Sequence, residues 1–193
     1  MNQAEEIIAD AQGKVDEASF LLARMREAIT HPHLDEAERQ FGLYFSSFLS
    51  DARSVLQIIS RHEGIRRKSA TDDWSWLERA KEGWANDDRK LLQLLKKLRD
   101  DSIHQGRGKV ESRIEFVAEQ ELLFRPRDAL IGYVSISQPL GLDVPPQTFA
   151  VKRFSLKVGD QTVPALECAE RYLSLVKLAL DHYKAAMSPP SAG

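Results

Sequence analysis

The chain has little with which to form cross-links or to attract a charged partner over a distance. Its 193 residues include a single cysteine, Cys168, so an intrachain disulfide is excluded. The net charge is −2, so any binding of nucleic acid must use a local basic patch and not the field of the whole protein. The shortage of cysteine fits a protein of a reducing compartment.

Long apolar stretches are also missing. No run approaches the roughly 18 apolar residues that a membrane span needs. The first residues, MNQAEEIIADAQGK, are acidic and lack the apolar segment of a secretory signal. We therefore expect a cytoplasmic protein with no membrane contact. Hydrophobic residues make up 42% of the chain and charged residues 29%, which is ordinary for one globular domain of this length.

The signatures of common catalytic and cofactor sites do not occur. The sequence has no glycine-rich phosphate loop, no Ser-His-Asp pattern and no paired Cys/His ligands. His31 and His33 flank Pro32 in a predicted turn, but further ligands are missing nearby, so this pair does not predict a metal site. We expect neither a metal nor a cofactor.

Apolar residues at helical spacing predict a helical bundle. Long helices are expected at 2–30, at 34–62, from the Asn86 cap to the Gly106 stop, and from Pro164 to about 187. The first stripe has heptad spacing, which is typical of an intermolecular coiled coil or of packing on a neighbouring helix. We favour packing within the chain, because a matching helix follows at once. A shorter helix is expected at about 73–85, where all three tryptophans suit burial or an interface better than base stacking.

After Gly108 the hydrophobic period changes to two. Residues 110–117, 129–137 and 148–157 are predicted strands, with prolines and glycines marking the loops. We therefore predict an α+β chain, mainly α, that forms a single domain over residues 1–187. A small antiparallel β insert, at about 109–160, precedes the last helix and carries no catalytic residue. Residues 188–193 are expected to form a disordered tail.

The segment with the most candidate catalytic side chains is LRDDSIHQG, residues 98–106, at the end of the third long helix. Asp100 and His104 are four residues apart, so on a helix their side chains are neighbours, and the carboxylate would orient the imidazole and favour its protonated form. Arg99 and His104 are five apart, about 140° around the axis and roughly 7.5 Å along it. One helix alone therefore cannot hold this pair side by side. A structural alternative is that both cations only complement the negative end of the helix dipole.

This motif resembles that of the HEPN domains, in which an arginine with a polar residue directly after it precedes a histidine by four to six intervening residues. The resemblance covers residues 34–106 and the last helix, whereas the long first helix and the strand insert depart from the minimal family pattern. It implies a HEPN-like helical bundle, a symmetric homodimer and metal-independent RNA cleavage, with Arg99, Asp100 and His104 as catalytic residues. Family members often act in toxin–antitoxin or phage-defence systems, and some have lost catalysis. A protein antitoxin or inhibitor would then be a further partner.

We therefore expect an endoribonuclease that cleaves RNA by acid–base chemistry at a dimer interface. The alternatives are a non-catalytic HEPN-like dimer that binds RNA or protein, and a purely structural helical dimer. Asp51 either faces the active site or, in the interpretation we prefer, pairs with a nearby arginine or faces solvent. Cys168 is expected to be a small, buried or half-buried helix residue and not a nucleophile. Weak candidates for RNA contacts are basic residues of the predicted 61–70 connection and one after the motif: Arg66, Arg67, Lys68 and Arg107.

Overall fold

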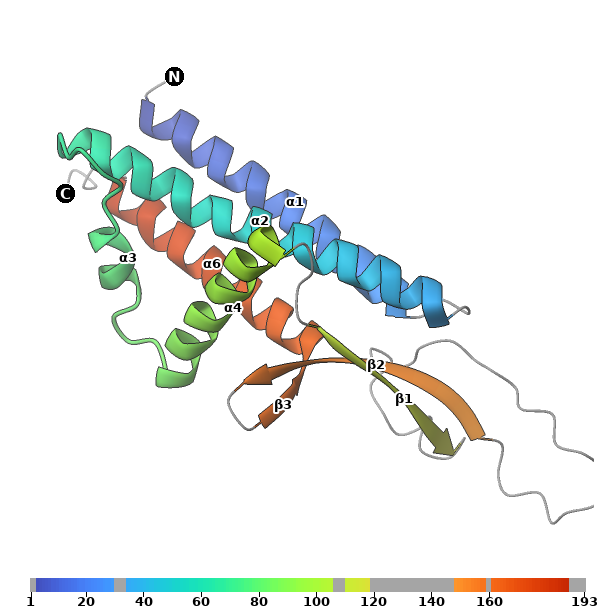
Figure 1. Ribbon diagram of the computed structural model, residues 1–193. Coiled ribbons are helices and arrows are strands. Elements are labelled where there is room, and N and C mark those ends of the chain that lie inside the picture. The colour runs from blue at the N-terminus through green and yellow to red at the C-terminus, as the bar shows by residue number, and fades with distance from the viewer. Residues whose placement is uncertain (1–2, 30–33, 106–109, 119–147, 159–160, 188–193) are drawn as a thin grey trace, which may run out of the picture.

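The computed structural model describes residues 3–29, 34–105, 110–118, 148–158 and 161–187 (Figure 1). It confirms the predicted class: the protein is mainly helical, with a small antiparallel sheet before the last helix. The predicted tail, the His31–His33 turn, Gly106 and the strand at 129–137 lie outside the described residues. The elements are α1 Gln3–Ile29, α2 Leu34–Arg66, α3 Ser75–Ala80, α4 Asn86–Gln105, β1 Glu111–Ala118, β2 Thr148–Val158, β3 Gln161–Pro164 and α6 Ala165–Met187.

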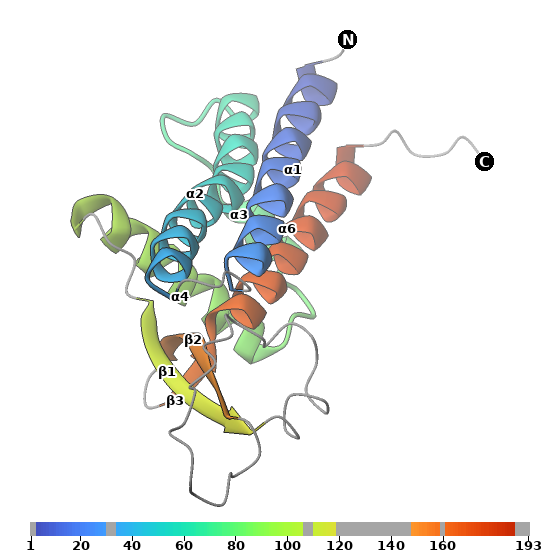
Figure 2. The ribbon, with the colours of Figure 1, turned by 90° about the vertical axis from the view of Figure 1, so that its right-hand side faces the viewer.

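Helices α1, α2 and α6 lie side by side and form the body of the bundle, and the sheet lies at one end of it (Figure 2). The apolar seam of α1 is buried within the chain, along α2 and α6, as the preferred interpretation of its heptad spacing predicted. Its buried residues are Ala4, Ala11, Val15, Ala18, Leu22, Met25, Ala28 and Ile29.

Helix α2 supplies the centre of the core. Phe41, Phe45 and Phe48 are fully buried, and burial of each such side chain stabilises the fold by about 1.5–3 kcal/mol. Phe41 stacks on Phe154 of β2 with ring centroids 4.1 Å apart, and Phe48 meets Tyr172 of α6 edge to face at 6.2 Å. These ring contacts join α2 to the sheet and to the last helix.

The sheet has the strand order β1-β2-β3, and both pairs are antiparallel. β1 and β2 confirm two of the predicted strands, whereas β3 was not predicted, because four residues are too short for a periodic pattern. Pro164 was expected to open the last helix, but it is the final residue of β3, where it lies opposite Ser155, and the helix begins at Ala165. Proline is tolerated there because an edge strand can do without the missing N–H donor.

Helix α2 runs one turn beyond the predicted end at residue 62, so the first part of the predicted 61–70 connection is helical. Lys68 adopts the left-handed conformation, with φ of 55°, and the Ser69 N–H donates to the Gly64 carbonyl at 2.8 Å, which closes the helix end. The charged residues of this segment suggested a solvated loop, but local ion pairs let them continue the helix. Helix α3 is shorter than the predicted 73–85, because turns occupy residues 81–83.

Glycine is required at position 64 because the chain passes close to α2 after that helix ends. A Cβ atom at this position would lie 2.5 Å from the Thr71 carbonyl oxygen, whereas a Cβ at Gly42 of the same helix would meet nothing within 4 Å. Gly64→Ala should therefore lower the free energy of unfolding by about 1–3 kcal/mol. Gly42→Ala should leave it unchanged or raise it by up to about 1 kcal/mol. Urea unfolding of both variants measures the difference, and equal stabilities would contradict this role of Gly64.

Candidate functional site

Helix α4 carries the motif and is positioned by a narrow apolar face. Leu92, Leu95 and Leu98 are buried, and the helix contacts α2 and α6. Near its start, Asp88 accepts two hydrogen bonds of 2.7 Å from the Arg171 guanidinium of α6, which lowers the pKa of this carboxyl group below its ordinary value. The helical backbone continues to Gln105, so positions 99, 100 and 104 lie in its last two turns.

Arg99 lies on the packing face of α4. It follows Leu95 by four residues, and its side chain is 26% exposed. Its Nη1 donates to Asp100 Oδ1 at 3.2 Å. Its Nε is buried and is the one buried side-chain nitrogen or oxygen that has no hydrogen-bond partner in the described part of the chain. An unmet buried donor costs about 1–3 kcal/mol.

A second guanidinium group, that of Arg53 on α2, belongs to the same cluster. It lies over the Trp74 ring, with Cζ 4.3 Å from the ring centroid. Burial lowers the pKa of Arg53; Tyr172 and Asp100 raise it, and Arg99 lowers it further. Tyr172 of α6 is buried, and burial raises its pKa to about 12 while both arginines oppose the shift. Arginine stays charged nonetheless, and the carboxylate of Asp72, like that of Asp100, raises the pKa of Arg53.

Arg53 was not predicted as a site residue from the sequence. The signal for it was an arginine inside the aromatic and aliphatic run of α2, four residues after Leu49 and next to Ala52, both of which are buried. An arginine at the edge of a core face buries its stem and keeps its head at the rim. The sequence pattern of α2 alone, however, does not predict that Arg99 of α4 lies near Arg53.

The structure brings together Arg99 and Asp100 of the predicted catalytic set. The side chain of His104 lies outside the description, so the predicted Asp100–His104 pair stays a prediction. The same holds for Arg107, which falls in a gap of the described residues.

The basic segment at the end of α2 is largely neutralised by carboxylates. Arg66 donates to both Glu63 oxygens at 2.9 and 2.7 Å, and Arg67 lies 3.0 Å from Asp73. Lys68 is exposed. Two of the weak candidates for RNA contacts therefore already carry structural ion pairs, whereas Lys68 has none with any described residue.

Those ion pairs belong to a buried polar network that the sequence did not predict. Tyr183 donates its hydroxyl hydrogen to Glu63 at 3.1 Å, so the His62 Nδ1, 2.7 Å from the same hydroxyl, must donate to it. His62 and Glu63 are 5% and 2% exposed. Trp76 is also buried and donates to Ser60 Oγ at 2.8 Å. The polar groups satisfy one another, so this network is structural.

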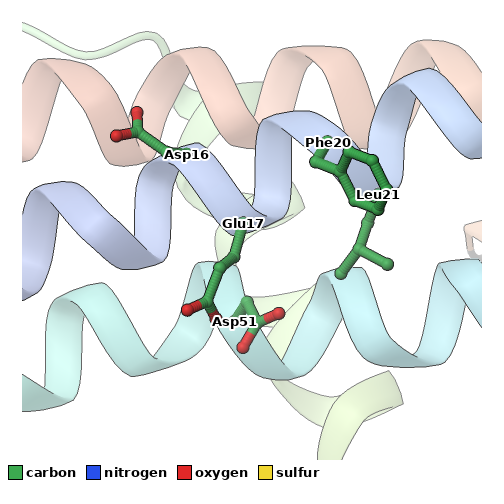
Figure 3. Close-up of a pocket in the computed structure, with 5 residues that line it drawn as sticks. All are labelled: Asp16, Glu17, Phe20, Leu21 and Asp51. Carbon is green, nitrogen blue, oxygen red and sulfur yellow. The ribbon is translucent and has the colours of Figure 1, made fainter.

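Asp51 lies in a surface pocket of about 380 Å³ between α1 and α2, with Asp16, Glu17, Phe20 and Leu21 of α1 (Figure 3). Lys14 bridges its carboxylate, at 3.2 Å, and that of Glu17. Asp51 therefore carries an ion pair, as one form of the preferred interpretation had it, but its partner is a lysine and not an arginine. Cys168 is buried as expected, and burial raises its pKa to about 11, which makes it a poor nucleophile.

The described helices and strands contain no group of three or more His, Cys, Asp or Glu side chains that could hold a metal ion. None of the described helices is both long and apolar enough to cross a membrane.

Glu63 links stability to pH. Burial raises its pKa, but the hydrogen bonds and charge of Arg66, with those of Tyr183 and Arg67, outweigh burial and hold the pKa below the ordinary 4.5. The stabilisation is therefore complete above that value and is lost as the pH falls through the lower folded pKa. Glu63→Gln should lower the free energy of unfolding at pH 7 by about 1–3 kcal/mol.

Thermal unfolding of wild type and Glu63→Gln between pH 7 and pH 3 tests this link. The difference between their unfolding temperatures should narrow below about pH 4.5. Glu78→Gln is the control, because Glu78 is 71% exposed in its pair with Lys81 and should change stability by less than about 1 kcal/mol. A difference in unfolding temperature that stayed constant with pH would contradict the assignment of this pH dependence to Glu63.

No protein-family model, curated protein or solved structure matches this chain. The expected resemblance to the HEPN domains rests on the sequence motif at residues 99–104. The ground for a functional assignment is therefore the chemistry of the cluster formed by Arg53, Arg99 and Asp100.

Proposed function

We propose that this protein is a metal-independent endoribonuclease of HEPN type that acts as a homodimer in the cytoplasm, as a toxin or phage-defence effector. The observation that carries the proposal is the state of Arg99. Its guanidinium group is largely withdrawn from water, paired with a single carboxylate, and left with an unmet buried N–H. A phosphate oxygen is a strong acceptor for a guanidinium group, and arginine retains its charge at every relevant pH.

The chemistry needs one proton acceptor, one proton donor and a cation. The 2′-hydroxyl of the RNA attacks the adjacent phosphorus, the bond to the 5′-oxygen breaks, and the products end in a 2′,3′-cyclic phosphate and a 5′-hydroxyl. His104 moves the protons, because an imidazole titrates near neutral pH. Arg99 stabilises the charge that develops on the phosphate oxygens, and Asp100 orients the histidine.

The helix geometry favours a dimer as the working unit. Arg99 lies on the face of α4 that packs on the bundle. Position 104 follows Arg99 by five residues, about 140° around the axis, so one helix cannot hold this pair side by side. Two helix ends related by a two-fold axis would place two histidines and two arginines around one phosphate, and two-fold contacts are the commonest way for identical chains to associate.

Cleavage of single-stranded RNA without added metal tests the mechanism. His104→Ala and Arg99→Ala should each lower the rate by at least about 10²-fold, because each removes a contribution made in the transition state. Asp100→Asn should lower it less, since it removes orientation and not the reacting group. EDTA should not inhibit, and the products should carry 2′,3′-cyclic phosphate. Arg24→Ala is the control, because Arg24 is an exposed residue of α1 paired with Glu27.

A need for Mg²⁺, or full activity of His104→Ala, would overturn the mechanism. A folded wild-type dimer that cleaves no RNA would instead favour the non-catalytic binding module. To separate folding from chemistry, each variant is compared with wild type by circular dichroism and thermal unfolding before its rate is measured.

The dimer itself is tested by light scattering coupled to size exclusion. At micromolar concentration we expect twice the chain mass of 21.8 kDa. Wild type and His104→Ala should give the same mass, because the histidine acts on substrate. A monomer over the whole concentration range would contradict the shared active site.

A further inference from the structure

We propose that the surface pocket between α1 and α2 is a docking site for a partner protein, and that it receives an arginine with an apolar neighbour. The pocket is lined by Asp16, Glu17, Phe20, Leu21 and Asp51 (Figure 3). It shares no residue with the RNA-cleaving motif, so this proposal does not depend on the nuclease.

The first ground is the division of the pocket wall into a charged and an apolar part. Figure 3 shows the carboxylates of Glu17 and Asp51 together on one side and the side chains of Phe20 and Leu21 together on the other. An arginine side chain has the same division, because its aliphatic stem packs on apolar surface and its planar head pairs with carboxylates. One arginine can therefore complement both parts of the wall.

The second ground is a surplus of negative charge. Three of the lining residues are carboxylates, whereas Lys14 is the one cation that forms an ion pair with any of them in the described ranges. Asp16 accepts a hydrogen bond from the neutral Gln12 amide at 3.0 Å. Three carboxylates against one ammonium group leave two negative charges uncompensated, and a cation from a partner complements them.

The third ground is the closeness of two of these carboxylates. The Lys14 ammonium contacts Glu17 and lies 3.2 Å from Asp51, so both acidic groups are within reach of one nitrogen. A guanidinium group has five N–H donors in one plane and can bridge two such neighbours. Both acids are open to solvent, because the Glu17 side chain is 55% exposed and that of Asp51 is 22% exposed.

The exposure of Phe20 favours a protein over a small cation. Its side chain is 57% exposed, and its ring already lies against the Arg24 guanidinium, with Cζ 5.0 Å from the ring centroid. Pockets for small molecules usually cover roughly 70–90% of the bound surface, which an open wall of this kind does not provide. A partner protein covers the rim with its own surface and buries the ring.

The first test selects binders without assuming a partner sequence. A phage library of short random peptides is depleted on full-length Glu17→Lys protein, which removes peptides that bind elsewhere, and is then selected on wild type. We expect the enriched peptides to carry an arginine beside an aliphatic or aromatic residue. Enrichment of peptides without arginine, or of no peptide at all, would overturn the docking site.

The second test measures the affinity of an enriched peptide, labelled with fluorescein, by anisotropy. Glu17→Lys should raise Kd by at least about tenfold, because it places like charges opposite each other. Glu78→Lys is the matched control, since Glu78 is also an exposed glutamate paired with a lysine three residues away. It should leave Kd unchanged. An equal effect of the two variants would show a response to total charge and would overturn the site.

Changes in the peptide and at Phe20 separate the two parts of the wall. Replacing the peptide arginine by lysine should weaken binding, because the planar fork is lost, and replacing it by alanine should weaken binding further. Phe20→Ala should raise Kd more than Phe20→Leu, which keeps an apolar side chain. Equal affinity of the arginine and alanine peptides would contradict the proposed contact.

Nuclear magnetic resonance on wild-type protein covers the case in which the variants unfold. Propylguanidinium is titrated into the full-length chain, and methyl signals are followed. The Leu21 methyl groups should shift saturably, whereas those of Leu43, an exposed leucine of α2 away from the pocket lining, should not. Propylammonium should shift Leu21 less. Equal shifts at both leucines would remove the pocket as the binding site.

Other occupants of the pocket give different results. A lower mass of Glu17→Lys than of wild type in light scattering would assign the pocket to contact between copies of this chain. Displacement of the arginine peptide by an equal concentration of spermidine would assign it to a small polyamine. Either result would overturn the partner protein, and neither would bear on RNA cleavage, which is measured through His104→Ala.

Discussion

The buried face of α2 is the surface on which the rest of the bundle depends. Helices α1, α3, α4 and α6 all contact α2, and the stack of Phe41 on Phe154 brings β2 to the same face. Each fully buried aromatic side chain contributes about 1.5–3 kcal/mol, far more than a surface ion pair. The direction of α4, and with it the place of Arg99, therefore follows from hydrophobic packing. This packing also sets the positions of the charged groups of the motif.

Two groups of charged side chains on and beside α2 differ in how the free-energy cost of burying charge is compensated. Near its C-terminal end, Glu63 is matched by Arg66, Arg67 and the Tyr183 hydroxyl, so its low exposure is compensated. Closer to its middle, Arg53 lies over the Trp74 ring, and on α4 Arg99 is paired with Asp100 and keeps one N–H group unmet. Buried charge destabilises a fold unless it is paired. The uncompensated donor is therefore a local cost at the place where the motif predicts chemistry, and such local costs are typical of functional sites.

How far the sequence could predict this structure depends on how local each feature is. The α1 seam and the stripes of α2, α4 and α6 could be read because a helix with one apolar face must bury that face. The end of α2 was misjudged because the charges at 61–67 resemble a solvated loop until Glu63 is known to be buried among its partners. β3 is held by pairing with β2, and its four residues contain no periodic signal of their own. The position of Pro164 was misassigned for the same reason.

The sequence by itself determined the helical class, the β insert, the burial of Cys168 and the placement of Arg99 and Asp100 in the last turns of one helix, because these follow from periodicity and spacing within a single segment. Only the tertiary structure decided that Arg53 joins Arg99, that Arg66 and Arg67 are neutralised, and that Asp51 pairs with Lys14. The electrostatic state of a side chain depends on the distances to all charges around it, and the partners of Arg53, Arg67 and Asp51 lie on other elements of the chain. No pattern within one helix contains those distances.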